Sequence, residues 1–149
     1  MDLKEKGFTL IEMIIALFIL AIGILGLLNM QVAAINGNLS ASQMTIATTL
    51  AQDQIEQLKR LPFTDAALND SKTANNATLT TPSNASSFDQ ADANNPLEEG
   101  GREYQRYWNI ADNTPTQGAK TVVAFVYWGA IGANGLPRHR VTIPTIIGQ

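Results

Sequence analysis

Cysteine is absent from the sequence, and His139 is its only histidine. These absences exclude disulfide bonds, thiolate metal sites and cysteine nucleophiles. Basic residues are too few to give a basic face, because the formal net charge is −3, so we expect no nucleic acid partner. Spacing indicates no serine or acidic partner for His139, and the glycines near the carboxy terminus do not form a phosphate-binding loop. We therefore expect no catalytic site, metal or cofactor, and predict that the protein is not an enzyme.

Hydrophobic residues make up 45% of the chain and are unevenly distributed. The block from Met13 to Leu28 contains no polar side chain, and with the residues from Phe8 onward it approaches the ~20 residues that cross a bilayer as a helix. A secretory signal peptide and a plain membrane anchor are two simple interpretations. However, the block is longer than the ~7–15 residue core of a signal peptide. Glu12 also lies in its leading end, where a carboxylate is costly and indicates a function.

Glu12 gains a charged partner if the chain is cut between Gly7 and Phe8. The cut creates an amine on Phe8 that is largely protonated at neutral pH, because its pKa lies near ~7.7–8.0. When such helices pack side by side with an axial shift, the amine of one helix meets the carboxylate of another. This pairing is much stronger in a dry bundle than in water, so we expect it to set the stagger between subunits.

The segment Gly7-Phe8-Thr9-Leu10-Ile11-Glu12 resembles the cleavage and methylation motif of type IV prepilins and pseudopilins. The resemblance implies that residues 1–7 are a leader, and that a prepilin peptidase cuts after Gly7 and methylates the new amine of Phe8. It also implies that Glu12 guides assembly with other pilin subunits and the pilus assembly machinery. Residues 8–30 then form a helix that spans the membrane and later lies in the filament core.

Two further stretches bear on the kind of pilin and its orientation. The stretch from Ala21 to Leu27 is similar to that of PilV-type minor pilins, and Asn29 stands where major pilins often carry proline. Lys4 and Lys6 in the leader predict a cytoplasmic amino terminus. We expect a single-pass protein of the inner membrane whose carboxy-terminal head is periplasmic, and which then moves to a pilus at the cell surface.

Beyond the apolar block the helical pattern becomes amphipathic over residues 31–61. Apolar residues such as Ile46 and Leu50 recur at three- and four-residue spacing, with polar residues between them. Lys59 and Arg60 suit the negative end of a helix dipole, and Pro62 cannot continue a helix. The pattern predicts one helix from Phe8 to Leu61, whose apolar half contains two glycines, Gly23 and Gly26.

Residues 64–101 form a low-complexity segment rich in Asn, Ala, Ser, Thr and Asp, and we expect a polar loop there. Asp89, Asp92, Asn94 and Asn95 offer oxygen atoms of the kind that bind calcium. Their spacing does not match an EF-hand, and a solvated acidic loop is the favoured interpretation.

Residues 102–149 predict a three-stranded antiparallel sheet. The strands are expected at 103–110, 120–128 and 138–147, with the second in the centre because it is apolar on both faces. Tyr104 and Trp108 share one face of the first strand, and Arg138 and Arg140 share one face of the third. Covered by the amphipathic helix, the sheet gives an α+β fold similar to that of type IV pilins. The aromatic residues are expected in the core and at its rim, with an exposed adhesive patch as the alternative.

The function expected from the resemblance is that of a minor pilin, a structural and assembly subunit of a type IV pilus. One alternative keeps the fold and places the chain in type II secretion, as a minor pseudopilin of the GspI kind. Another is a membrane-tethered periplasmic binding module that retains its uncut amino terminus and uses the acidic loop or the aromatic residues.

Overall fold

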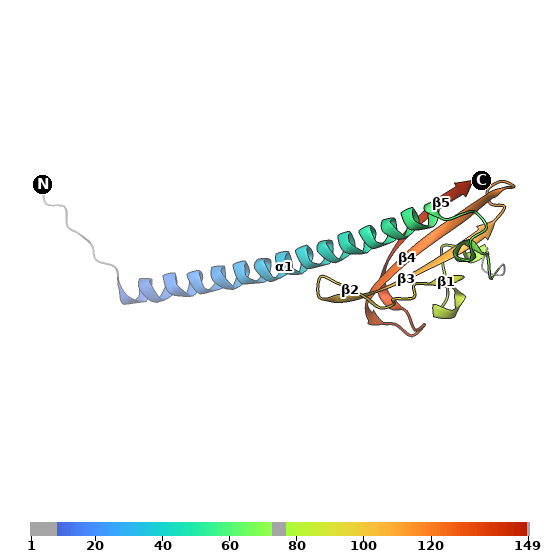
Figure 1. Cartoon of the computed structure of the whole chain (residues 1–149). Coiled ribbons are helices and arrows are strands. Elements are labelled where there is room, and N and C mark those ends of the chain that lie inside the picture. Colours follow the sequence, from blue (N-terminus) through green and yellow to red (C-terminus); the bar gives the residue numbers. More distant parts are fainter. Residues whose placement is uncertain (1–8, 73–76, 149) are drawn as a thin grey trace, which may run out of the picture. The chain divides into compact units, whose positions relative to one another are not determined.

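The structure is a computed structural model that describes residues 9–72 and 77–148 (Figure 1). It has the expected α+β fold, in which a long amino-terminal helix packs on an antiparallel sheet. In chain order the elements are helix α1 (Leu10–Arg60), the short 3-10 helices η1 (Ala66–Leu68) and η3 (Ala85–Ser87), and strands β1 (Gln90–Ala91), β2 (Leu97–Glu99), β3 (Arg102–Asp112), β4 (Ala119–Ile131) and β5 (Pro137–Gly148). The chain divides into two compact units, an amino-terminal unit of residues 1–42 and a carboxy-terminal unit of residues 43–149.

Helix α1 begins after Thr9, which caps its first turn. The Glu12 N–H donates to the Thr9 carbonyl (3.1 Å) and to the Thr9 hydroxyl (3.3 Å), so a polar side chain satisfies an amide that has no partner within the helix. The helix ends at Arg60, one residue before the predicted end, with Lys59 and Arg60 in its last turn. The predicted start at Phe8 lies outside the described residues.

The sheet has five strands, two more than the sequence predicts. Strands β3, β4 and β5 form the expected antiparallel meander with β4 between its neighbours, and the strand order is β1-β3-β4-β5. The two additional strands, β1 and β2, come from the segment predicted to be a loop, and both pair with β3. Each is only two or three residues long, which is too short to give a recognisable alternation of polar and apolar residues.

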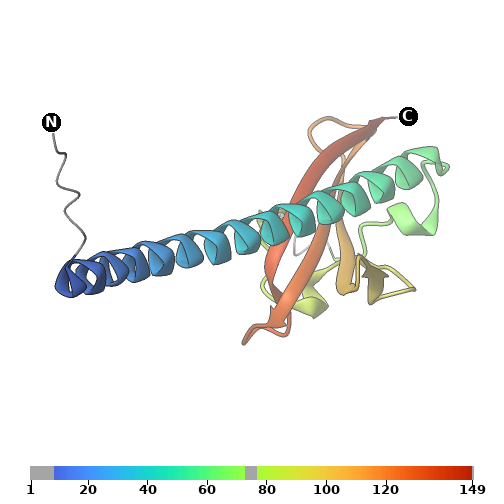
Figure 2. The same cartoon turned by 90° about the vertical axis from the view of Figure 1, so that its left-hand side faces the viewer.

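One face of the sheet is covered by the second half of α1, which lies across the strands (Figure 2). Ala47 and Ala51 on the helix have no exposed surface. They pack with Tyr104 of β3 and with Val126 of β4, and Trp108 lies in a second cluster toward the end of the helix. Small side chains on the helix therefore let it approach the large side chains of the sheet, as the amphipathic pattern predicts.

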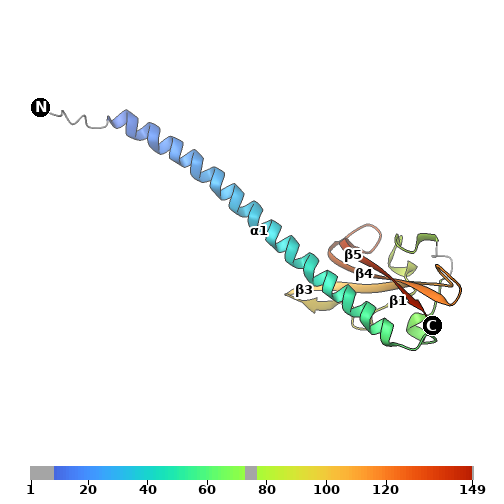
Figure 3. The ribbon, with the colours of Figure 1, turned by 90° about the horizontal axis from the view of Figure 1, so that it is seen from above.

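The opposite face of the sheet is covered by the segment between α1 and β3 (Figure 3). Phe88 from this segment stacks on Tyr107, with ring centroids 4.5 Å apart, and contacts Phe125 and Tyr127. This packing explains why β4 is apolar on both faces. The sequence identifies β4 as central but does not show that the polar segment covers its second face.

Asp89 and Asp92 differ from the solvated acidic loop that the sequence predicts. Asp89 is 9% exposed, and its carboxylate accepts hydrogen bonds from the backbone N–H groups of Lys72 (2.7 Å) and Ile110 (2.8 Å). The Asp92 carboxylate pairs with Arg106 of β3, and both side chains are 9% exposed. These oxygens attach the segment to β3, which is a structural role.

Candidate assembly site

The amino-terminal unit exposes nearly all of its large apolar side chains. Leu10 is 78% exposed, and Phe18 near the middle of the block is 67% exposed. Every residue from 10 to 42 falls in the exposed class. Burial of apolar surface is the main stabilising contribution to folded proteins, and contiguous exposed apolar surface marks an interaction site for a membrane or another protein. This part of α1 is long and apolar enough to cross a membrane.

Glu12 is the only charged residue in this apolar part of α1. It lies in the first turn of the helix, where a negative charge is favourable beside the positive end of the helix dipole. Its side chain is exposed, and its N–H is bound to the Thr9 cap. The carboxylate is therefore held at the amino-terminal end of the apolar surface and is open to a partner from outside the chain.

The two other predicted site residues, Gly7 and Phe8, lie outside the described residues. Cleavage after Gly7 and methylation of Phe8 remain predictions, and so does the pairing of Glu12 with an amine. Of the predicted site, the structure describes only the first turn of α1, which carries Glu12.

Gly23 and Gly26 lie within the continuous helix and do not break it. A methyl group added at either position would meet no atom within 4 Å. Glycine costs about 1 kcal/mol relative to alanine in a helix interior, and no contact among the residues that the structure describes requires glycine at these positions. The surface beside them is open for the close approach of another backbone.

The aromatic residues of the carboxy-terminal unit do not form an exposed adhesive patch. Tyr104, Trp108, Tyr127 and Trp128 are at most 7% exposed, and Tyr107 is half-buried in its stack with Phe88. They lie in the core and at its rim, as expected from the sequence, and not in the alternative exposed patch.

His139 also has a packing role in the carboxy-terminal unit. It is exposed and stacks on Trp128, with ring centroids 5.6 Å apart. Within the described ranges, no group of three or more His, Cys, Asp or Glu side chains could hold a metal ion.

The sequence analysis missed the buried ion pair between Asp92 and Arg106. The Arg106 guanidinium also donates to the Leu50 carbonyl of α1 (3.2 Å), so it connects the helix, β3 and the preceding segment. Arg106 does lie on the predicted helix-facing side of β3, and a charged residue between Tyr104 and Trp108 was the available signal. Nothing in the sequence shows that Asp92 is its partner.

The family model of the prokaryotic N-terminal methylation motif matches residues 2–28. This match includes Gly7, Phe8 and Glu12 together with the apolar block. No curated protein sequence matches the chain, and no solved structure does. The match and the fold describe a protein similar to type IV pilins and pseudopilins, with a prepilin N-methylation motif, which is a structural protein and not an enzyme.

The motif itself implies two kinds of partner. A chain with this motif is processed by a prepilin peptidase and is handled by pilus machinery. A membrane-crossing apolar helix directly after the motif is consistent with a prepilin stored in the inner membrane.

Proposed function

We propose that the chain is a minor pilin, a subunit of a type IV pilus that enters the filament through its amino-terminal helix. One observation supports this most directly: Glu12 is an exposed carboxylate at the start of an apolar helical surface that packs against nothing in the described part of its own unit. A membrane anchor alone needs no carboxylate at that position, because a charge in the bilayer is costly. A subunit that must find its register beside other helices does need such a group.

In the proposed mechanism, the uncut chain lies in the inner membrane with its leader in the cytoplasm and its carboxy-terminal unit in the periplasm. The peptidase removes residues 1–7 and methylates the amine of Phe8. Glu12 then pairs with the amino terminus of a neighbouring subunit within the water-poor bundle, where the attraction between opposite charges is strong. Other pilin subunits supply the apolar surfaces that cover residues 10–42.

The first test is the mass of the mature amino terminus in protein from the native host. We expect a chain that begins with methylated Phe8, and we expect Gly7→Val to leave the leader in place, because a branched side chain then occupies the position beside the cut bond. Recovery of the intact leader on the wild-type protein would contradict the proposal and would favour the tethered binding module.

The second test replaces Glu12 by alanine. The Glu12→Ala variant should remain in the membrane, since it loses a charge from an apolar helix, but its share in sheared filaments should fall at least about tenfold, which corresponds to a loss of 1.4 kcal/mol. Glu56→Ala is the matched control, because Glu56 lies on the same helix and makes only an exposed contact with Arg60 at 3.8 Å. If Glu12→Ala and the control were incorporated equally, Glu12 would have no role in assembly.

A deletion strain separates the pilus from type II secretion. Loss of surface filaments, restored by the wild-type chain, is the result expected for a minor pilin. Loss of protein secretion with normal filaments would assign the chain to a secretion machine instead.

A further inference from the structure

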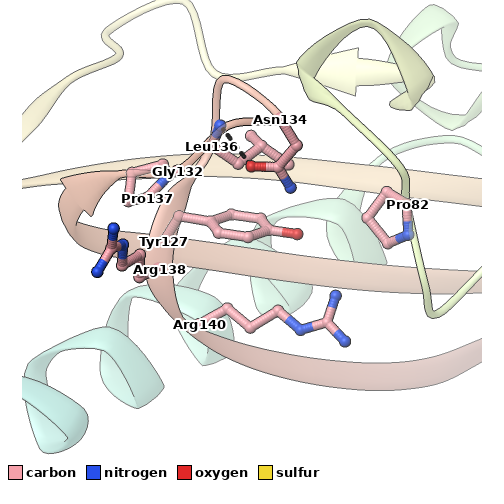
Figure 4. A pocket seen from close by; sticks show the side chains of 8 residues that line it. All are labelled: Pro82, Tyr127, Gly132, Asn134, Leu136, Pro137, Arg138 and Arg140. Carbon is pink, nitrogen blue, oxygen red and sulfur yellow. Dashed lines mark hydrogen bonds between the residues drawn. The ribbon is translucent and has the colours of Figure 1, made fainter.

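A pocket of about 320 Å³ lies on the face of the sheet opposite α1 (Figure 4). Its volume is at the lower end of the range found for small-molecule sites. It is formed by the ends of β4 and β5, the turn between them, and one residue of the segment that precedes β1. The lining residues are Pro82, Tyr127, Gly132, Asn134, Leu136, Pro137, Arg138 and Arg140.

The charge of this pocket is opposite to that of the chain. The formal net charge of the protein is −3, yet the described residues that line the pocket include two arginines and no acidic residue. Both arginine side chains are exposed. Of the described ion pairs, none includes Arg138 or Arg140, so their charges are not neutralised by a carboxylate in the described part of the chain.

Tyr127 places a buried, unsatisfied O–H group at this pocket. Its side chain is 3% exposed. The Arg140 guanidinium lies beside its oxygen, but its O–H donates to no acceptor among the residues that the structure describes. The hydroxyl points into the space between Asn134, Pro82 and Arg140 (Figure 4). A buried O–H without an acceptor costs free energy. An acceptor atom of a bound ligand would remove this cost.

Register and turn geometry fix the groups around this hydroxyl. Tyr127 of β4 is paired directly with Arg140 of β5, which places the guanidinium beside the phenol ring. Asn134 uses its side-chain oxygen to accept the N–H of Leu136 (3.2 Å), and this contact turns its amide nitrogen toward the pocket (Figure 4). Arg138 lines the outer end, and its guanidinium points away from the hydroxyl.

Each of the polar groups that converge on the pocket can therefore donate a hydrogen bond to a ligand. Burial raises the pKa of the Tyr127 hydroxyl, and the Arg140 guanidinium opposes only part of this rise, so the hydroxyl stays protonated at neutral pH. A guanidinium, a phenol O–H and an amide N–H together match the acceptor oxygens of an oxyanion, and arginine binds carboxylates and phosphates with two parallel hydrogen bonds.

We propose that this pocket binds an oxyanion group, a carboxylate or a phosphate ester, on a ligand of monosaccharide size. Arg140 binds the anion, Tyr127 and Asn134 donate to its oxygens, and Arg138 adds positive charge at the outer end. All of these residues lie in the carboxy-terminal unit, so the pocket does not depend on the proposed role of Glu12 in assembly.

The test uses the full chain in zwitterionic detergent micelles and measures binding by calorimetry. The probes are galacturonate, glucose 6-phosphate and neutral galactose, which distinguish a carboxylate from a phosphate and both from an uncharged sugar. We expect saturable binding of at least one of the two anions and none of galactose. Failure of both anions to bind at millimolar concentration, or equal binding of galactose, overturns the proposal.

Variants separate a binding role from a structural one. Arg140→Gln and Tyr127→Phe should each weaken binding about tenfold or more, which is the loss expected when one charged or well-placed hydrogen bond is removed. Arg102→Gln is the control, because Arg102 is an exposed arginine of β3 outside the pocket, and it should bind normally.

Tyr127→Phe has a second readout. It should keep or raise the melting temperature of the free protein, because it removes a buried O–H that donates to no acceptor, while it weakens binding. A lowered melting temperature with unchanged binding would show that the hydroxyl has a structural role, and the proposal would fail.

Discussion

At the residue scale, Arg106 is a buried charge that connects three parts of the carboxy-terminal unit. Its guanidinium is buried between α1 and β3, and it has a carboxylate partner in Asp92 and a carbonyl partner in Leu50. The backbone of Arg106 is also hydrogen-bonded to Asn95. The Asn95 side-chain nitrogen donates to the Arg106 carbonyl (2.8 Å), and the Arg106 N–H donates to the Asn95 side-chain oxygen (2.8 Å). Asn95 thus pairs with β3 as a strand residue would, between β1 and β2.

We expect Asp92→Asn to lower the free energy of unfolding by about 3 kcal/mol, because removal of one member of a buried pair leaves the other charge uncompensated. Urea unfolding in detergent can be followed by fluorescence, since both tryptophans of the chain, Trp108 and Trp128, are buried in the core. Glu98→Gln is the control, because Glu98 is an exposed residue of the neighbouring strand β2. A loss no larger than that of the control would show that the pair contributes little.

The same pair predicts a dependence of stability on pH. Burial alone would raise the pKa of Asp92, but the N–H of Asn94 and the Arg106 guanidinium outweigh it, so the pKa lies below its usual value of 3.8. Asp92 therefore adds stability that is fully present above pH 3.8 and is lost as the pH falls through the folded pKa. The difference between wild type and Asp92→Asn should be constant near neutral pH and shrink below about pH 4.

At the element scale, the contact between α1 and the sheet depends on small residues in the helix. Ala47 and Ala51 lie one turn apart, and neither has exposed surface. We expect Ala51→Leu to lower the free energy of unfolding by about 1–3 kcal/mol, because added methylene groups find no space in a packed core. Gln52→Leu, on the exposed side of the same turn, should have a much smaller effect in the same urea assay. Equal effects of the two variants would mean that this contact is loose.

The elements that the sequence predicts are those with long, regular patterns. Strands β3, β4 and β5 and the carboxy-terminal end of α1 lie within three residues of their predicted ends, because their apolar residues repeat over many positions. Strands β1 and β2 were not predicted, since they are held by specific partners such as Asn95 rather than by a pattern. The oxyanion pocket was partly visible in the sequence, where Arg138 and Arg140 share a face of β5. Its depth depends on Pro82 and Asn134, whose positions only the fold determines.

At the scale of the whole molecule, the two units use apolar residues in opposite ways. The carboxy-terminal unit buries them on both faces of β4, whereas the described part of the amino-terminal unit exposes them along α1. The carboxy-terminal unit can therefore be stable in water. The amino-terminal unit needs a membrane or other subunits to cover its apolar surface. A subunit that is stored in a bilayer and later packed into a filament has this requirement.

The apolar helix is expected to tolerate one arginine near its centre but not two. A central leucine or isoleucine favours insertion by about 0.3–0.6 kcal/mol and a central arginine opposes it by about 2.5–3.5 kcal/mol. The apolar residues of this helix together favour insertion by about 4–8 kcal/mol on that scale, so Leu20→Arg should remain in membranes washed at alkaline pH. The Leu17→Arg/Leu20→Arg variant loses about 6–8 kcal/mol on the same scale, which cancels the favourable energy, so a much larger share of it should be released.

The Leu17→Ala/Leu20→Ala variant controls for lost side-chain volume and should stay in the membrane. Release of the single Leu20→Arg variant would mean that the helix inserts with much less favourable energy than its composition indicates. Retention of the double arginine variant would mean that another part of the chain holds the protein at the membrane. The expected order therefore tests whether apolar surface on α1 is the anchor, separately from the assembly role proposed for Glu12, because these substitutions leave that carboxylate in place.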